Sequence, residues 1–449
     1  MQPNQRETVL RFIQTALRYF QLKYFFKKVP RNTIPHVEFE GETGFTVVTS
    51  LGIFGDLLCH QHRRKLQSFN TALLAADMLI SQNFVQPIVI DCSDTPPPEA
   101  YTLECIERDL EPMLAEYITK YNTFKFDKQH ASELLDKHLI NWSLSNIAID
   151  IFAPLCNFQA DFDEFLLPNG CKISRFLPAE KNRIRTSIFD YEYSWGIWDL
   201  AKCQYKIHFS YTVRRDEGLR VPETIQDKIK NTITALRLTR KGSLKAIHAF
   251  AVVAPPVIRD GIGGFSLSLD TSGFPEDYRL TEPDKARLVS LVNLLDQFQN
   301  HSDMKRLLLA FQWLHKSYSR MDIQEIIISQ VITLECTLLA HDSNELSYRL
   351  GTRGAALLRD SRDAVVTDAI LRALYDARSK IVHEGATGEI VAKIARKTAN
   401  MSLAEFTTNS EQIIRQILIE YLARLAPDIS IKSINKELDA YVIQSIQKN

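Results

Sequence analysis

Arg378 and His383 are two residues whose types and spacing could together cleave a phosphodiester. They lie in the stretch YDARSKIVHEGATG, residues 375–388, with four residues between them. A histidine titrates near neutral pH, so His383 can serve as a general base or a general acid. A guanidinium binds two phosphate oxygens at once, so Arg378 can stabilise the charge of the transition state. Because RNA carries its own nucleophile, the 2′-hydroxyl, this chemistry would cut RNA and leave DNA intact.

The spacing of the pair is weak evidence by itself. Eleven histidines, three tolerated spacings and an arginine frequency of roughly one in twenty predict about two such matches by chance. A second match does occur, from Arg31 to His36, but Pro35 prevents a continuous helix there. The interpretation of Arg378 and His383 therefore depends on the elements that position them.

Residues 363–382 are predicted to form a helix that Gly385 terminates, so His383 lies in or just past the last turn. Side chains five positions apart point about 140° from each other on an ideal helix, so the pair converges only if the helix ends or bends between them. A helix C-terminus also favours basic side chains without any catalysis, and this alternative stays open. The predicted apolar face consists of Val365, Val366, Ala369, Ile370, Ala373, Leu374 and Ile381.

Residues 305–385 contain further landmarks, in a fixed order along predicted helices. They are Leu334-Glu335, the segment RGAALL at 353–358, Tyr375, Arg378, Ser379 and His383. Their order and separations resemble the HEPN domain, in the subgroup that includes the ApeA anti-phage protein. Two upstream segments, GCKISRFLPAEKNRI at 170–184 and NTITALRLTRKGSL at 231–244, resemble segments that accompany this type of HEPN domain.

The resemblance implies a bundle of four or five helices that dimerises and cleaves RNA across the dimer cleft without a metal or other cofactor. It implies that Arg378 and His383 are the catalytic pair. Family members often place Asn, Asp or His directly after the arginine, where this chain has Ser379. Glu335 and Arg353 are expected to form a buried pair that holds the cleft in shape. The supporting positions are thus Ser379, Glu335, Arg353 and Tyr375.

The expected function is that of a metal-independent endoribonuclease in the cytoplasm, acting in anti-phage defence, abortive infection or as a toxin. Its products would be a 2′,3′-cyclic phosphate and a 5′-hydroxyl, and residues 1–280 would sense a phage or host trigger. One alternative is a catalytically inactive HEPN dimer that binds RNA or another protein. Another is a HEPN protein that assists nucleotidyl transfer by a separate partner, because this chain lacks the GS…DxD pattern of a nucleotidyltransferase.

The composition sets further bounds. Lys and Arg together equal Asp and Glu, 54 each, so any contact with RNA must use local basic patches. Seven cysteines without a CxxC motif predict reduced, mostly buried thiols. The N-terminal stretch lacks the pattern of a signal peptide, and the sequence lacks an uncharged apolar run of about 18 residues, so no membrane span is expected.

The predicted fold class is α+β. Residues 1–280 are expected to form a mixed α/β region with a substantial antiparallel sheet and a sub-boundary near residue 145. An all-α HEPN-type bundle should follow at 284–427, and then an amphipathic tail at 428–449. Helices are predicted at 7–22, 69–79, 99–120, 129–140, 222–237, 284–298, 304–318, 323–341, 345–358, 363–382 and 402–425. Strands are predicted at 45–54, 84–91, 147–155, 191–198, 203–213, 248–258 and 263–270.

Other chemical motifs are weak. Residues 59–62, CHQH, have no second pair of ligands at zinc-finger spacing, and GIGG at 261–264 lacks the lysine and helix of a phosphate loop. No metal site is therefore expected. Basic stretches, which could bind RNA but are more typical of solvated faces, lie at 23–31, 62–65, 181–185, 214–215 and 237–245.

Overall fold

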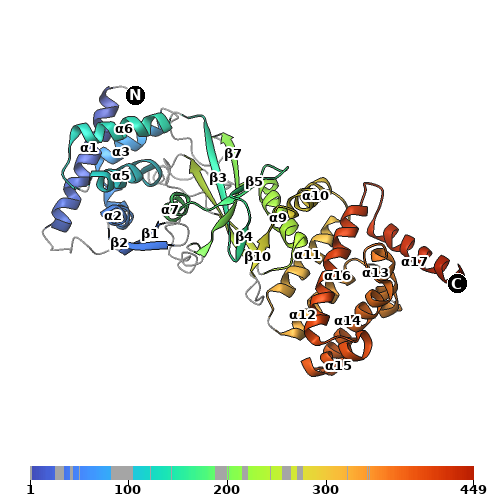
Figure 1. Ribbon diagram of the computed structural model, residues 1–449. Coiled ribbons are helices and arrows are strands. Elements are labelled where there is room, and N and C mark those ends of the chain that lie inside the picture. The colour runs from blue at the N-terminus through green and yellow to red at the C-terminus, as the bar shows by residue number, and fades with distance from the viewer. Residues whose placement is uncertain are drawn as a thin grey trace. The chain divides into compact units, whose positions relative to one another are not determined.

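A computed structural model gives the fold of most of the chain (Figure 1). The described residues are 3–25, 35–40, 44–49, 51–81, 105–121, 123–142, 144–187, 200, 202–214, 221–242, 244–254, 264–269, 277–320, 322–340, 342 and 344–448. The chain divides into two units. The first contains Met1–Ala153, Phe176–Pro222 and Ala249–Phe265, and the second contains Pro154–Arg175, Glu223–His248 and Ser266–Asn449.

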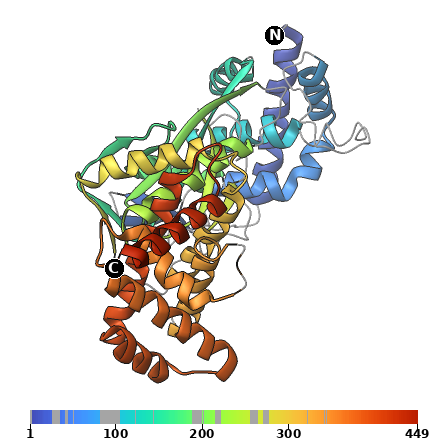
Figure 2. The ribbon, with the colours of Figure 1, turned by 90° about the vertical axis from the view of Figure 1, so that its right-hand side faces the viewer.

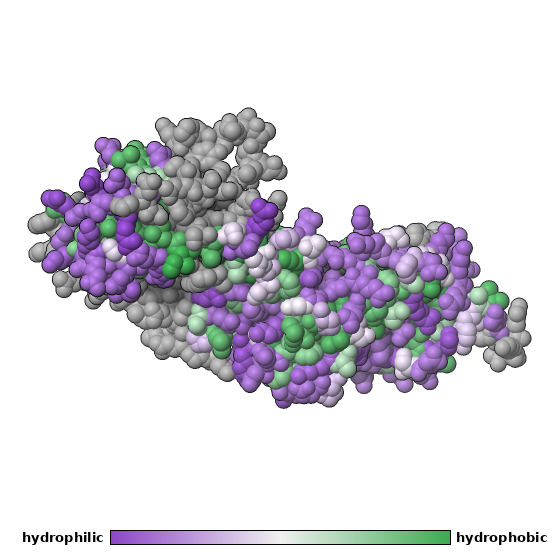
Figure 3. All heavy atoms as spheres, turned by 90° about the horizontal axis from the view of Figure 1, so that it is seen from above, coloured by the Kyte–Doolittle hydropathy of each residue, from purple (hydrophilic) through white to green (hydrophobic). Residues whose placement is uncertain are grey.

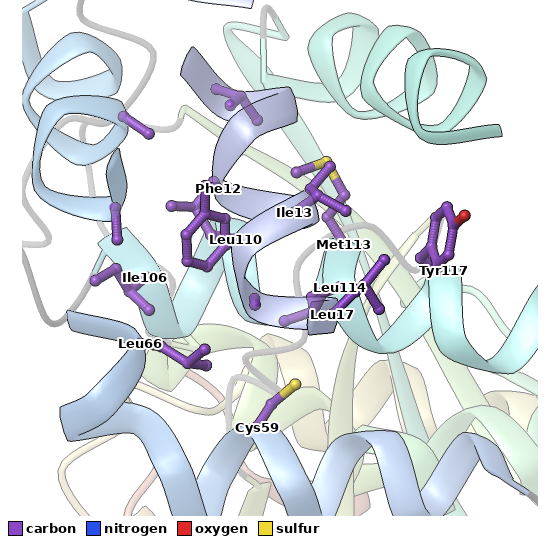
Figure 4. Close-up of a cluster of buried hydrophobic side chains, with 14 of the residues drawn as sticks. Phe12, Ile13, Leu17, Cys59, Leu66, Ile106, Leu110, Met113, Leu114 and Tyr117 are labelled. Carbon is purple, nitrogen blue, oxygen red and sulfur yellow. The ribbon is translucent and has the colours of Figure 1, made fainter. Parts of the chain in front are cut away.

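The helices of the first unit pack around an apolar core. They are α1 (Pro3–Phe20), continued by the π-helical turn η1 (Gln21–Phe25), α2 (Leu51–Gln67), α3 (Asn70–Ser81), the π-helical turn η2 (Ile106–Leu110) with α5 (Glu111–Tyr121), and α6 (Lys128–Trp142). Figure 4 shows Phe12 and Ile13 of α1 beside Leu110 and Met113, in a cluster that also contains Leu17. These side chains are buried, and their removal from water is the main stabilising contribution here.

The strands form one larger sheet and two pairs. In the larger sheet the order is β5 (Glu164–Leu166), β6 (Lys172–Arg175), β7 (Tyr205–Arg214), β3 (Asn146–Leu155), β8 (Ala246–Ala254) and β9 (Gly264–Leu269). Strand β3 pairs antiparallel with β8, with Ala148 opposite Ala254 and Phe152 opposite Phe250. The pairs are β1 (Pro35–Glu40) with β2 (Gly44–Thr49), antiparallel, and β4 (Phe158–Ala160) with β10 (Tyr278–Leu280), parallel. Helix α7 (Pro178–Ser187) follows β6.

The second unit is mainly helical. Its helices are α9 (Glu223–Thr239), α10 (Asp284–Gln297), α11 (Met304–Tyr318), α12 (Ile323–Glu335), α13 (Leu346–Leu358), α14 (Ala364–Glu384), α15 (Gly388–Ala399), α16 (Leu403–Arg424) and α17 (Ile431–Lys448). From α10 onward they lie alongside one another, coloured yellow to red in Figures 1 and 2. Helix α9 contacts both α10 and α16. It therefore packs with the helical region, although a strand-rich segment separates α9 from that region in the sequence.

The described surface is mostly hydrophilic on the face drawn in Figure 3, with hydrophobic residues in small scattered groups. Among the helices that the structure describes, none combines the length and the apolar character that crossing a membrane requires. Single exposed apolar side chains are normal on such a surface.

The mixed architecture expected from the sequence is confirmed, with an antiparallel sheet in the first part and helices in the last. Helix α11 has the predicted bounds, and the predicted helices at 345–358, 363–382 and 402–425 end within two residues of α13, α14 and α16. The predicted strand 45–54 is only partly right, because Leu51 begins helix α2. The predicted segments 84–91 and 191–198 lie outside the described residues.

The cysteines differ in part from expectation. Cys59, Cys105, Cys171 and Cys336 are free and buried, as predicted for thiols in a core. Cys156 and Cys203 are disulfide-bonded, so the prediction of reduced thiols is wrong for these two. Cysteines of a disulfide come together through the tertiary fold, which their separation in sequence does not reveal.

Candidate active site at the end of helix α14

Helix α14 positions the candidate pair and has a defined start and end. The Asp363 side chain accepts a hydrogen bond from the Val366 amide, at 2.9 Å, and so caps the first turn. At the other end Gly385 has φ +64°, and the amides of Gly385 and Ala386 donate to the carbonyls of Ile381 and Lys380. The predicted stop at Gly385 is therefore confirmed, and His383 lies in the last turn of the helix.

The buried face of α14 differs in part from the predicted apolar face. Val365 and Val366 are exposed, so their assignment to that face is wrong. They lie in the first turn, where α14 has only begun to pack against its neighbours. The residues that are buried along the helix are Thr367, Ile370, Leu371, Ala373, Leu374 and Ala377.

Arg378 lies at the edge of this buried face and is held by one carboxylate. Its Nη2 atom is 3.4 Å from Oε1 of Glu335, at the end of α12, and the two side chains are 26% and 30% exposed. The Nε atom of Arg378 has no hydrogen-bond partner in the described part of the chain. The Nε atom is buried, so the donors that this single long ion pair leaves free to bind a ligand are those on the two Nη atoms.

Tyr375 belongs to the same group of side chains. Burial raises the pKa of its hydroxyl, while the charge of Arg378 lowers that pKa and the charge of Glu335 raises it. All three residues are thus within electrostatic range of one another. The structure brings together three of the residues that the sequence singled out, namely Arg378, Glu335 and Tyr375.

His383 is not part of this group. Helix α14 continues without a break to Glu384, so Arg378 and His383 point about 140° apart. Leu374, in the core, lies nine residues before His383, which is about 180° around the helix, and His383 is exposed. The bend or early end that would let the two side chains converge is absent from α14. Ser379 is partly exposed on the turn between them.

Arg353 does not pair with Glu335, and the prediction of a buried Glu335–Arg353 pair is wrong. Arg353, on α13, donates from Nε and Nη2 to the carboxylate of Asp439, at 2.7 and 2.6 Å, and from Nη1 to Asp342 and the carbonyl of Leu338. Burial lowers the pKa of Arg353, but the hydrogen bonds to Asp439 and Asp342 outweigh it, so the pKa lies above its ordinary value. Arg353 is a structural cation, and Glu335 is left to Arg378.

Asp439 is a residue that sequence reasoning missed. It lies on α17, in the segment interpreted as an amphipathic tail, and α17 packs against α13. Asn435 of the same helix accepts a hydrogen bond from Tyr421 and donates to the carbonyl of Thr337, at 3.0 Å. The tail is therefore anchored on the helical bundle by buried polar contacts.

The segment after α14 is also fixed. Gln324, in the first turn of α12, donates to the carbonyl of Ala386. Helix α15, which the sequence analysis did not predict, then begins at Gly388 and packs against α14 and α16. These contacts hold the end of α14, and with it the backbone of His383, in one position relative to α12.

Of the other motifs, the structure describes part of the CHQH segment and part of the second Arg–His match. Cys59 is part of the apolar core of the first unit, and His62 of the same CHQH segment lies 3.1 Å from the hydroxyl of Tyr19. In the described part of the chain, no group of three or more His, Cys, Asp or Glu side chains has the arrangement of a metal site. In the second Arg–His match, His36 belongs to strand β1, and Arg31 lies outside the described residues.

Comparisons with known proteins do not identify a family for this chain. No family model matches the chain, and neither the curated proteins nor the solved structures include a match. The resemblance to the HEPN domain thus stays a prediction that depends on the residues quoted above.

Proposed function

We propose that the protein is a HEPN-type endoribonuclease in which Arg378 and His383 act on the phosphodiester of RNA. The observation that carries the proposal is the contrast within the last two turns of α14. Arg378 is held beside Glu335 and Tyr375 with most of its donors available, whereas His383 is exposed at a capped helix end. One residue type binds phosphate and the other exchanges protons near neutral pH.

The 140° between the two side chains supports a dimeric site. Within one chain Arg378 and His383 point to different sides of α14, so the proposal uses a second copy of the chain. Two copies supply two histidines and two arginines, and this suits a reaction that requires a base and an acid on opposite sides of one phosphorus. The HEPN resemblance implies a dimer of this kind.

The proposed chemistry is a transesterification followed by product release. One His383 removes the proton from the 2′-hydroxyl, and the 2′-oxygen attacks phosphorus. The bond to the 5′-oxygen breaks, and the second His383 gives that oxygen its proton. Arg378 binds the non-bridging oxygens, whose negative charge grows in the transition state. The products are a 2′,3′-cyclic phosphate and a 5′-hydroxyl, and no metal takes part in these steps.

The test is to incubate the purified protein with total RNA in the presence of EDTA and to map the cut ends. We expect cleavage by the natural protein, and loss of at least about 100-fold in rate for His383→Ala and Arg378→Ala. Lys380→Ala is the matched control, because Lys380 is an exposed cation on the same turn of α14. Intact RNA with the natural protein, or equal cleavage by His383→Ala, would refute the nuclease.

A second candidate function is a non-catalytic HEPN dimer that binds RNA or a partner protein. The ion pair between Arg378 and Glu335 favours it, because a guanidinium already paired with a carboxylate is a less effective phosphate ligand. This candidate predicts RNA or partner binding without cut ends, and partner binding that Arg378→Ala leaves unchanged.

The biological setting follows from the toxicity of an unrestrained ribonuclease. We place the protein in the cytoplasm, in prokaryotic defence or as a toxin, with residues 1–280 sensing a phage or host trigger. Expression of the natural chain should then slow growth, and expression of His383→Ala should not.

A further inference from the structure

Helix α16 carries a cluster of polar side chains that is separate from the ion pair of Arg378 and Glu335. Glu411, Gln412, Arg415 and Gln416 have the three- and four-residue spacings that place side chains on neighbouring turns of one side of a helix. Helices α9 and α10 lie beside α16, as Figure 1 shows. The segment after α13, which contains Arg362, also reaches this part of α16.

Arg415 lies at the centre of the cluster, and contacts with neighbouring residues fix the position of its guanidinium. Its Nε atom is 3.2 Å from Oε1 of Glu411, and its Nη1 atom donates to the carbonyl of Thr239 at 3.4 Å. Glu411 is buried and accepts a hydrogen bond of 2.5 Å from the hydroxyl of Tyr318. This chain of contacts holds the guanidinium of Arg415 in one orientation.

Arg362 and Arg287 lie near Arg415, and neither forms an ion pair with a carboxylate among the residues that the structure describes. Arg362 donates to the neutral amide oxygens of Gln416 and Gln412. Arg287, on α10, is exposed and forms no ion pair or hydrogen bond with any residue that the structure describes. For both arginines, partial burial and then the charge of Arg415 lower the pKa, so each of them lies close enough to Arg415 for like-charge repulsion.

The negative charge in this part of the molecule does not balance these arginines. Asp284 forms an ion pair of 2.7 Å with a fourth arginine, Arg240, and its charge also raises the pKa of Arg287. Glu411 forms an ion pair with Arg415 and its charge raises the pKa of Arg362, so among the described residues these two carboxylates serve four arginines. Like charges held together in a partly buried place destabilise the fold unless an anion joins them.

We infer that Arg287, Arg362 and Arg415 bind a phosphate group. The guanidiniums of Arg287 and Arg362, each near that of Arg415, offer many N–H donors, and a tetrahedral phosphate has enough oxygens to accept from several of them, whereas a carboxylate has two. The phosphate belongs either to the backbone of RNA or to a free nucleotide, and these sources share the same chemistry. The binding requires no cleavage, so this inference stands whether or not the protein is a nuclease.

The test measures binding to the full chain carrying His383→Ala, so that the proposed nuclease activity cannot remove the ligand. The probes are a labelled 12-nucleotide RNA, adenosine triphosphate and inorganic phosphate. We expect Arg287→Gln and Arg362→Gln each to weaken binding of at least one probe by about 5–10-fold, as for loss of one charge-assisted contact. With the RNA probe, the slope of log affinity against log salt should fall by about 0.7 for each phosphate contact removed.

The matched control is Arg396→Gln, an exposed arginine on α15 whose Nε donates only to the carbonyl of Ala392. Because Arg287 forms no hydrogen bond or ion pair with a described residue and only its charge acts on Asp284, its loss should leave the fold unchanged and shift the unfolding midpoint little. An effect with RNA alone identifies the backbone phosphodiester as the ligand, and an effect with the small probes identifies a free nucleotide or phosphate. Equal affinity of Arg287→Gln, Arg362→Gln and Arg396→Gln for all three probes would overturn the inference.

Discussion

Two arginines of the helical unit, Arg353 and Arg378, are held in contrasting ways. Arg353 is 3% exposed and donates to two carboxylates and one carbonyl, so its donors are used within the fold. Arg378 is 26% exposed and has one ion pair of 3.4 Å. Sequence resemblance assigned both residues to the same site. The structure separates them, and the comparison shows that an arginine is available for a ligand only where the fold leaves its donors unused.

The largest expected effect that tests this comparison is that of Arg353→Ala. The substitution leaves the partly buried carboxylates of Asp342 and Asp439 with the more exposed Arg349 as their remaining cation, so we expect a loss of about 3 kcal/mol in the free energy of unfolding. Urea unfolding followed by circular dichroism measures it. Arg353→Lys should recover only part of the loss, because lysine cannot donate bidentately to Asp439. A loss below about 1 kcal/mol would mean that Arg353 is not a structural cation.

Glu116 of the first unit extends the comparison to a carboxylate with two basic partners, His138 and Lys137. The hydrogen bond from His138 lowers its pKa to about 2 against the opposing effect of burial, and Lys137 adds to the lowering. A carboxylate with a depressed folded pKa contributes stability above its unfolded pKa of 4.5 and loses it as the pH falls toward 2. At pH 6 we expect the free energy of unfolding of the natural protein to be about 2 kcal/mol larger than that of Glu116→Gln.

This advantage of the natural protein over Glu116→Gln should shrink as the pH falls from about 4.5 toward 2. Unfolding free energies of both proteins across that range check it. A difference that stays constant with pH would show that Glu116 is not held by its cations.

Gly385→Ala tests how much the left-handed cap at the end of α14 contributes to stability. A Cβ at this position would meet nothing within 4 Å, so the penalty comes only from the positive φ, and we expect about 1 kcal/mol. Gly385→Asn should cost less, because asparagine tolerates this conformation. Unfolding measurements give the stabilities. If alanine and asparagine behave alike, the left-handed cap is not what holds the helix end.

The smallest expected effect is that of Arg378→Ala on stability. Its pair with Glu335 is partly exposed, so we expect a loss of about 0.5 kcal/mol. The same urea unfolding experiment as for Arg353→Ala measures it, which makes the two substitutions a matched pair. A loss for Arg378→Ala as large as that for Arg353→Ala would remove the contrast on which the candidate site depends.

Local patterns in the sequence predicted the elements well where the signal is strong. Helix α14 begins after Asp363 and ends at Gly385, because a capping carboxylate and a glycine act on their own neighbours. Helix α15 was missed because it buries only Val391 and Ala395, which is too few apolar positions for a clear periodicity. The strand predicted at 45–54 wrongly included the first residues of α2, because the apolar residues LGIF fit either a strand or a helix.

The sequence by itself determined which residue types end helix α14, and so placed Arg378 and His383 about one and a half turns apart. It also determined the helical character of most of the chain after Asp284. Only the tertiary structure decided which carboxylate meets which arginine, because Glu335, Asp342 and Asp439 come from separate segments whose approach depends on packing. The divergence of Arg378 from His383 was decided in the same way, by the contacts that keep α14 straight to its cap.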